Sequence, residues 1–270
     1  MTDERVRPKK RLGQHFLRDP HVLDRIADAV GAGPDDTVIE VGPGEGVLTD
    51  RLASRAGRVI AIELDRDLVP RLRARYAAQP HVRIVEADVL DVDLAAEAGG
   101  PFLLAGNVPY YITTPILFHA LRAPRPSRAV YLVQKEVADR VVAPAGHDDY
   151  GALSVNVQAL AHATRLFVVS AGAFRPPPKV DSAVLLVTPR ADPLVRPDEE
   201  HGFQRFVIAL FGQRRKQLLR AVREVTDLSA DRAATVLAEV GLAPAVRAET
   251  LPPEQLVSLY RAVQVARASV

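Results

Sequence analysis

Three closely spaced glycines, Gly42, Gly44 and Gly46, lie in the segment VIEVGPGEG, after an apolar run and before a helical pattern. Because glycine has no side chain, a ligand can approach the backbone of such a loop closely. A dinucleotide loop has the spacing Gly-x-Gly-x-x-Gly around a pyrophosphate, whereas this loop reads Gly-x-Gly-x-Gly and contains Glu45. Because a carboxylate repels pyrophosphate, the loop favours S-adenosylmethionine, which carries a sulfonium and an amino group but no phosphate.

Two acidic residues follow the next apolar runs. Glu63 stands 21 residues after Gly42, where a carboxylate can accept hydrogen bonds from ribose hydroxyls. Asp88 follows the third run, in EADVL, where it can accept from an adenine amine. Either residue alone is more often an exposed strand end or a helix cap. Together with the glycine loop, they predict a site for S-adenosylmethionine.

The segment Asn107, Val108, Pro109 and Tyr110 follows the fourth apolar run. An exocyclic aromatic amine is a poor nucleophile because its lone pair is delocalised into the ring. The Asn107 side-chain oxygen and the Val108 carbonyl can accept the two amine hydrogens, while Tyr110 stacks on the base and Pro109 fixes the turn. The same four residues also fit an Asx turn beside a half-buried tyrosine. Their position after a cofactor loop favours methylation of an amine.

These residues must be positioned by a sheet, because ligands of open α/β folds bind at the carboxyl ends of the strands. Short runs rich in Val, Ile and Leu alternate with amphipathic helical patterns from about Thr37 to Thr188. We therefore predict an α/β fold, doubly wound around a mostly parallel seven-stranded sheet of the Rossmann-like methyltransferase type. The predicted strands are Val38 to Val41, Val59 to Leu64, Val82 to Glu86, Phe102 to Ala105, Val130 to Gln134, Arg165 to Val169 and Ala183 to Val187.

The composition changes after Thr188, where PRADPLVRPDEE is rich in proline and charge and nothing beyond it resembles a strand. We predict two domains, a methyltransferase domain over residues 1–188 with a basic N-terminal arm, and a small helical domain over residues 189–270. An apolar stripe of Phe203, Phe206, Leu210 and Leu218 predicts one helix that carries the basic residues up to Arg223 on its outer side.

Charge is unevenly distributed along the chain, although the net charge of its 270 residues is only +2. Residues 1–18 contain six Lys or Arg and two acidic residues, and residues 205–223, the C-terminal basic segment, contain six and none. The two segments are candidates for nucleic-acid contact, with solvated surface charge as the alternative. The predicted RNA-binding residues are Arg11, Arg214, Arg215, Lys216 and Arg220.

Composition also excludes several classes of protein. No apolar run approaches the roughly 18 residues of a membrane span, and the charges of the N-terminus are not followed by the apolar stretch of a secretory signal. The chain has no cysteine, and its seven histidines form no convincing ligand pair, so we expect no metal. These features predict a cytoplasmic protein that does not act at a membrane.

Nine motifs in a fixed order resemble one family: KKRLGQHFL, IEVGPGEGVLT, IELDRDL, EADVL, GNVPYYITTPIL, QKEVADR, YGALSV, FRPPPKVDSAV and FGQRRKQLLRAV. The chain resembles the ribosomal RNA adenine dimethyltransferases, which include bacterial small-subunit enzymes, eukaryotic dimethylases and erythromycin-resistance methylases. The last two motifs are more similar to those of the bacterial small-subunit (16S) enzymes than to those of the resistance methylases.

The resemblance implies a monomer that dimethylates two adjacent adenosines near the 3′ end of 16S rRNA in an immature small ribosomal subunit. It implies a second base-stacking face at Phe174. His15 stands where the family often has Asn. The resemblance also implies a set of residues that contact S-adenosylmethionine: His15, Leu17, Gly42, Gly44, Glu63, Asp88 and Asn107.

Two alternatives remain open from the sequence. One is a ribosome-assembly factor in which binding matters more than methylation. The other is a methyltransferase that acts on 23S rRNA or on an amide nitrogen, because Asn-x-Pro-Tyr also suits amides.

Overall fold

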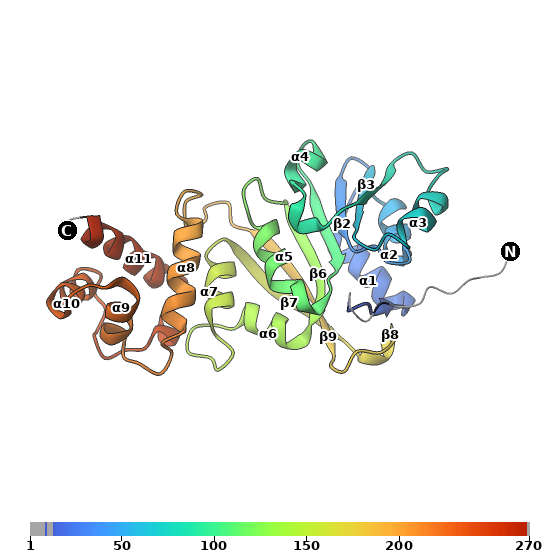
Figure 1. Cartoon of the computed structure of the whole chain (residues 1–270). Helices are drawn as coiled ribbons and strands as arrows, with labels where there is room; N and C mark the ends of the chain where they lie inside the picture. Colours follow the sequence, from blue (N-terminus) through green and yellow to red (C-terminus); the bar gives the residue numbers. More distant parts are fainter. Residues whose placement is uncertain (1–8, 10–12, 269–270) are drawn as a thin grey trace. The chain divides into compact units, whose positions relative to one another are not determined.

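The computed structural model describes Lys9 and residues 13–268 (Figure 1). Its contacts divide these residues into two units. The first unit contains the described residues up to Ala138 together with Ala163–Pro189, and the second contains Asp139–His162 and the chain from Arg190 onward. The second unit thus holds the helical region expected from the sequence, plus residues 139–162, which the predicted domain limits place in the first domain.

A seven-stranded sheet forms the centre of the first unit, and its strands from β4 to β6 run parallel. Strand β9 is antiparallel to β6, and β7 takes the edge beside β9. The doubly wound α/β fold is confirmed, and each predicted strand has a counterpart. In spatial order they are β4 (Val82–Glu86), β3 (Arg58–Glu63), β2 (Thr37–Val41), β5 (Leu103–Asn107), β6 (Arg128–Gln134), β9 (Ser182–Pro189) and β7 (Ala161–Val169).

Helices cover the central strands on two sides (Figure 1). On one side α1 (Pro20–Val30), α2 (Val47–Ala53) and α3 (Val69–Arg75) share a core with alternate strand residues such as Val38 and Val59. The intervening strand residues, among them Ile39 and Ile60, are equally buried. Helices α4 (Leu94–Ala98) and α5 (Thr113–Ala120) follow β4 and β5. Burial of both faces explains the unbroken apolar runs and makes the sheet a firm support for the loops at its edge.

A small second sheet pairs two distant segments of the first unit. Strand β1 (Phe16–Leu17) runs antiparallel to β8 (Phe174–Arg175), with Leu17 opposite Phe174. The amide of Arg18 also donates to the carbonyl of Ala173 at 2.8 Å. Two residues per strand are too few to show a periodic pattern, so the sequence did not reveal this pairing. It fixes the N-terminal segment to the loop that follows β7.

The second unit consists of helices and turns within its described residues after Pro189. Tyr150, which is fully buried, joins residues 139–162 to this unit, because its ring lies edge-on to Phe211 at 5.9 Å and its hydroxyl donates to the Leu251 carbonyl at 2.9 Å. Helix α6 (Lys135–Val142) leads into the unit, whose other helices are α7 (Ala152–Gln158), α8 (Glu200–Phe211), α9 (Leu218–Thr226), α10 (Ala230–Glu239) and α11 (Pro253–Ala268). Short 3₁₀ helices occur in both units. Those of the first unit are Val89–Asp91 (η2), Tyr110–Ile112 (η3) and Ala171–Ala173 (η4), and that of the second is Ala248–Thr250 (η5).

The prediction of one helix from Phe203 to Arg223 is wrong. Helix α8 ends at Phe211 and α9 begins at Leu218. The first N–H groups of α9 are bound from outside the helix, since Leu218 donates to the Val246 carbonyl at 2.7 Å and Leu219 donates to the Pro244 carbonyl at 3.2 Å. These tertiary hydrogen bonds favour a helix start that the apolar spacing does not reveal. The residues Arg214, Arg215 and Lys216 therefore lie in a turn.

Candidate active site

One pocket of the first unit brings together almost all of the predicted site residues. It opens at the carboxyl ends of β2, β3 and β5 and is also lined by the N-terminal segment from Gly13 to Leu17. This is the edge of an open α/β sheet where ligands bind. The predicted residues that line it are His15, Leu17, Gly42, Gly44, Glu63, Asp88, Asn107, Val108, Pro109 and Tyr110. Phe174 is absent from the lining.

The glycine loop adopts backbone angles that side chains disfavour. Gly42, Gly44 and Gly46 have φ values of 67°, 59° and 82°. A Cβ atom on Gly46 would lie 2.6 Å from the Tyr76 hydroxyl, and one on Gly44 would lie 3.1 Å from the Phe16 ring. Conformation therefore favours glycine at all three positions, and close packing also requires it at Gly44 and Gly46.

Tyr76 anchors the glycine loop through a hydrogen bond to its backbone. Its hydroxyl lies 2.8 Å from the Gly46 carbonyl and 2.8 Å from Oδ1 of Asp50. Arg75 pairs with Asp50 and donates to the Glu45 carbonyl at 3.3 Å. The sequence indicated only that Tyr76 belongs to a helix core, because a hydroxyl that reaches a loop 30 residues away leaves no local pattern.

Glu63 lies at the end of β3 and is only 6% exposed. Its Oε2 accepts from the Gly44 amide at 3.0 Å and its Oε1 accepts from the Asp65 amide at 2.8 Å. Burial raises the pKa of Glu63, and these backbone donors oppose the rise. Each carboxylate oxygen keeps a further lone pair, so the group can still accept from ribose hydroxyls.

Asp65 connects this region to the N-terminal segment. The side-chain amide of Gln14 donates to Asp65 Oδ2 at 2.8 Å, and Lys9 pairs with the same carboxylate. The hydrogen bond from Lys9 lowers the pKa of Asp65 against the effect of burial. Asp88 has a local contact, because it accepts from the Leu90 amide at 3.0 Å and so caps η2.

Glu40 is a buried carboxyl that the sequence reasoning missed. It lies inside β2, lines the pocket and is 1% exposed. Its Oε2 has no hydrogen-bond partner within the described part of the chain. Burial raises the pKa of Glu40 to about 8; the neighbouring Thr49 hydroxyl opposes the rise, and the Glu63 and Asp50 carboxylates add to it. The signal was present, since a charged residue stands between the apolar residues Ile39 and Val41 in the strand TVIEV.

Asn107 has a defined orientation at the end of β5. Its Nδ2 donates to the His15 carbonyl at 2.9 Å, which leaves the side-chain oxygen available as an acceptor. The Val108 amide donates to the Leu132 carbonyl at 3.1 Å, and the Thr113 hydroxyl donates to the Pro109 carbonyl at 3.2 Å. These contacts hold the Asn-x-Pro-Tyr backbone in a fixed conformation, which a catalytic acceptor needs.

Tyr110 is held at its hydroxyl and on one face of its ring. The hydroxyl lies 2.6 Å from Oγ of the fully buried Ser182. The His15 ring stacks on Tyr110 with centroids 5.7 Å apart and planes 24° apart. Burial raises the pKa of Tyr110. Ser182, from FRPPPKVDSAV, is a second residue that sequence reasoning did not single out.

Phe174, which the resemblance gives as a second base-stacking face, is buried and does not line the pocket. Its side chain is 2% exposed and packs in the core cluster with Leu23 and Val169. Its backbone is paired with Leu17 in the small β1–β8 sheet. In this structure Phe174 therefore offers no ring face to a ligand, because the pairing that the sequence did not reveal directs it into the core.

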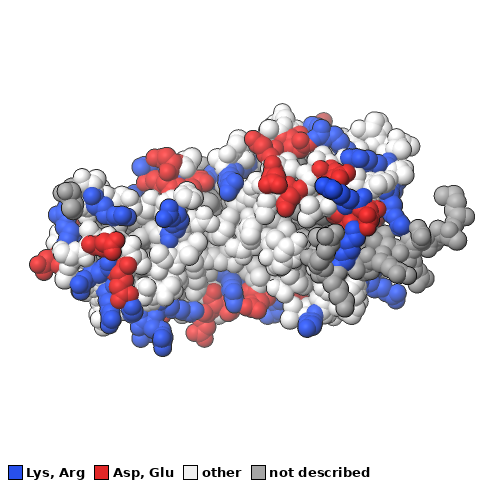
Figure 2. All heavy atoms as spheres, viewed as in Figure 1, with Lys and Arg blue, Asp and Glu red and all other residues white. Residues whose placement is uncertain are grey.

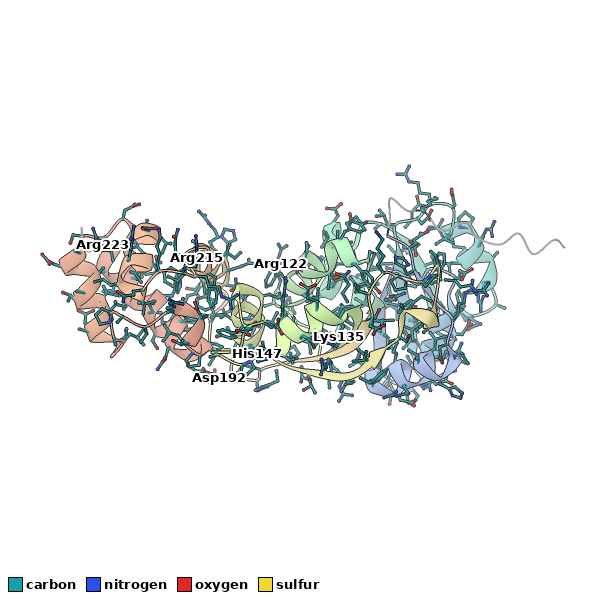
Figure 3. The ribbon with its side chains drawn as sticks, turned by 90° about the horizontal axis from the view of Figure 1, so that it is seen from below. Arg122, Lys135, His147, Asp192, Arg215 and Arg223 are labelled. Carbon is teal, nitrogen blue, oxygen red and sulfur yellow. The ribbon has the colours of Figure 1, made fainter. Side chains whose placement is uncertain are left out.

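The C-terminal basic segment is partly neutralised by its own surroundings. On the face shown in Figure 2, Lys and Arg side chains gather around α9, with acidic side chains among them. Glu224 pairs with Lys216 and with Arg220, and Arg214 donates to the Asp148 carbonyl at 2.7 Å. Arg215, in the turn, and Arg223, on α9, are exposed and form no ion pair with the described residues (Figure 3). Arg11, also predicted to contact RNA, lies outside the described residues.

Neither a metal centre nor a membrane segment was found within the described ranges. No group of three or more His, Asp or Glu side chains there is arranged to hold a metal ion. No helix among these residues has the length and apolar character that a membrane crossing requires.

Comparison with known proteins identifies the family. The family model for ribosomal RNA adenine dimethylase matches residues 5–264. The chain belongs to the ribosomal RNA adenine dimethylase family. Relatives named ribosomal RNA small subunit methyltransferase A are 45% identical in Geobacter metallireducens, over 97% of this chain and 98% of the relative, and 44% identical in Xanthomonas campestris, over 93% and 94%. Membership makes the protein an rRNA adenine dimethyltransferase, as the nine motifs predicted.

Two solved structures are similar over nearly the whole chain. The 23S rRNA methyltransferase ErmE is 30% identical, with a TM-score of 0.71, over 92% of this chain and 99% of that one. A dimethyladenosine transferase from Plasmodium falciparum has a TM-score of 0.80 at 23% identity, over 94% and 98%, and supports the fold alone.

Proposed function

We propose that this protein transfers methyl groups from S-adenosylmethionine to the N6 amines of two adjacent adenosines near the 3′ end of 16S rRNA. The substrate follows the names of its relatives in Geobacter and Xanthomonas, which denote small-subunit methyltransferases. The immature small subunit as the form of the substrate, a monomeric enzyme and a cytoplasmic location belong to the same proposal.

The observation that supports this chemistry most strongly is the state of Asn107. Its Nδ2 donates one hydrogen bond to the His15 carbonyl, which orients the amide and leaves its oxygen free to accept from a substrate. An acceptor at that point draws an N–H of the adenine amine and localises the nitrogen lone pair. Tyr110, held by Ser182, supplies a ring on which the base can stack.

The residues of the pocket suit S-adenosylmethionine. When bound, this cofactor supplies an electrophilic methyl group on a positively charged sulfur. A buried carboxyl with an unpaired oxygen, Glu40, and a second buried carboxyl, Glu63, lie in the lining, and a cationic ligand beside them would lower both of their raised pKa values and favour the ionised, attracting form. Glu63 and Asp88 would hold the ribose and the adenine, while the glycine loop packs against the amino-acid part.

Asn107 and Tyr110 then act on the substrate base. The base must leave its stack to reach them. Alignment of its amine for in-line displacement is the main contribution of these residues, and the proton can pass to water after transfer. No general base is assigned.

The decisive experiment is transfer from isotope-labelled S-adenosylmethionine to ribosomal particles whose adenosines are unmethylated. We expect label in 16S rRNA, at two adjacent adenosines, as dimethyladenosine after digestion. Label in 23S rRNA or in protein would instead support the second type of methyltransferase. Tight binding to small subunits without any label would support an assembly factor. The matched control is Asn107→Ala, which should bind the particles but label them about a hundredfold or more slowly.

A further inference from the structure

The segment of residues 174–182, FRPPPKVDS, connects two residues of the active site. Near its start, the Pro176 carbonyl accepts from Nδ1 of His15 at 2.8 Å, since a carbonyl cannot donate. At its end, Oγ of Ser182 lies 2.6 Å from the Tyr110 hydroxyl. His15 and Tyr110 both line the pocket. The segment is therefore held at two points beside the pocket, and strand β8 within it lies next to the N-terminal segment (Figure 1).

Lys179 stands midway between these two points, three residues from Pro176 and three from Ser182. Because a chain advances by at most about 3.6 Å per residue, the Cα of Lys179 lies within about 11 Å of the Cα atoms of both anchors. Three consecutive prolines precede Lys179, and the last of them, Pro178, is buried. Their fixed φ angles restrict the backbone. Lys179 thus projects from a stiff support close to the pocket.

The charge of Lys179 is not used within the described part of the protein. Its side chain is exposed and forms no hydrogen bond or ion pair with the described residues. Two cations of the N-terminal part are occupied, since Arg18 pairs with Glu45 of the glycine loop and Lys9 pairs with Asp65. An ammonium group without a carboxylate partner is available to an anion, and RNA presents a phosphate beside every base.

We propose that the Lys179 ammonium binds a backbone phosphate next to the target adenosine and thereby holds the unstacked nucleotide at the pocket. This inference rests on the proposed function and gives Lys179 the task of a positioning residue. A base that leaves its stack turns about its own backbone, so the flanking phosphates stay outside the pocket while the base enters it. Phosphate contacts of this kind fix the register and orientation of a nucleic acid without reading its sequence.

This contact should affect the rate of transfer more than the binding of the ribosomal particle. Lys179 meets its phosphate when the base reaches Tyr110, which is later than the first encounter with the RNA. An interaction made only at that stage favours the reactive arrangement over the initial complex, so it raises the rate at saturating substrate. The salt dependence of particle binding should change little, because many other phosphates contribute to it.

The test compares Lys179→Gln, which removes the charge, with Lys179→Arg, which keeps it. The matched control is Arg73→Gln, which removes another exposed cation of the first unit that has no ion pair with the described residues. Single-turnover methylation of unmethylated small subunits at saturating protein, particle binding and calorimetric binding of S-adenosylmethionine are measured on each protein. Thermal unfolding shows whether each variant is folded.

A modified RNA identifies the phosphate. Because the proposed target lies near the 3′ end of 16S rRNA, small subunits can be rebuilt with a synthetic 3′ segment. Each linkage that flanks the two adenosines is replaced in turn by a neutral methylphosphonate, with a 2′-deoxyribose on its 5′ side for chemical stability. The reference particle carries the same deoxyribose and an ordinary phosphate.

We expect Lys179→Gln to slow single-turnover methylation by about tenfold or more, which is the effect of one lost hydrogen bond to a charged group. Lys179→Arg should restore most of the rate, and Arg73→Gln should match wild type. Particle binding should change by less than about threefold and cofactor affinity by less than about twofold. At one linkage the methylphosphonate should slow wild type by the same factor and slow Lys179→Gln no further.

Three results would overturn the inference. The first is a folded Lys179→Gln that methylates at the wild-type rate. The second is a variant that binds particles more weakly but reacts normally at saturation, which would make Lys179 part of the general basic surface. The third is an equal loss in wild type and Lys179→Gln at every methylphosphonate, which would show that Lys179 contacts none of these phosphates. A wild-type protein that places no label in 16S rRNA would instead refute the proposed function itself.

Discussion

The pocket of the first unit and the C-terminal basic segment of the second unit are built in opposite ways. The pocket gathers residues as far apart in sequence as His15 and Asn107, and backbone groups fix their side chains. The basic segment gathers neighbours in sequence, and three of its cations are already bound to Glu224 or to the Asp148 carbonyl. Preorganised groups at a reacting centre contribute several kcal/mol, whereas exposed ion pairs contribute little. The two regions should therefore respond to substitution on different scales.

The largest effect is expected at Asn107. In Asn107→Ala the adenine amine loses a positioned acceptor, which is worth roughly 3 kcal/mol, or about a hundredfold or more in rate. RNA binding should largely survive, because the basic residues are untouched. Single-turnover methylation with saturating cofactor measures the loss, and a near-normal rate would remove Asn107 from the chemistry.

Glu40 should make stability depend on pH. Burial raises its pKa from 4.5 to about 8, so between these values the folded protein binds more protons than the unfolded chain. The free energy of unfolding should therefore fall as the pH rises through this window, by up to about 1.4 kcal/mol per pH unit from this group. Urea unfolding of wild type and Glu40→Gln at pH 6 and pH 8 tests this. We expect the stability difference between them to shift by about 2 kcal/mol in favour of the variant at pH 8. The same shift in both proteins would assign the effect to another group, such as Glu63.

Glu63→Ala should raise the dissociation constant of S-adenosylmethionine by about tenfold or more, because two ribose hydroxyls lose a charged acceptor worth roughly 1.5 to 3 kcal/mol. The substitution also removes the partner of the Gly44 amide, so part of the loss comes from the loop. Glu63→Gln keeps an acceptor oxygen and should lose less. Calorimetric titration compares the variants, and equal affinities in all three proteins would mean that the ribose is held elsewhere.

Local features of the sequence were enough to predict the sheet and most of the pocket. Buried parallel strands appear as unbroken apolar runs, and parallel strands bring their carboxyl ends to one edge, so the positions of Glu63 and Asn107 followed from the pattern. The buried position of Phe174 and the contact between His15 and Tyr110 depend on two-residue strands, which have no periodic signal.

The sequence predicted the positive charge of the C-terminal basic segment, but not which of its cations are paired within the protein. The run of cations from Arg205 to Arg223 ends one residue before Glu224, which pairs with two of them. The break between α8 and α9 depends on Pro244 and Val246, more than 20 residues further along the chain. Tertiary structure determines which cations remain available to bind RNA phosphates, and this cannot be obtained from a count of charges along the sequence.

The smallest effect is expected in the basic segment, where the structure divides the cations into two groups. Arg215 and Arg223 are exposed and outside the ion pairs of the described residues, whereas Lys216 shares Glu224 with Arg220. A cation that binds a phosphate releases counterions, so its loss lowers the slope of log affinity against log salt by somewhat under one unit. We expect the double variant Arg215→Gln, Arg223→Gln to lower the slope by between one and two units. The matched double variant Lys216→Gln, Glu224→Gln leaves the net charge unchanged and should alter the slope much less. Binding of 16S rRNA over a salt series, with circular dichroism to check the fold, separates the two. Equal losses would show that RNA displaces Glu224 from Lys216, and an unaltered slope in both variants would make the segment ordinary surface charge and favour the N-terminal arm with Arg11 as the RNA contact.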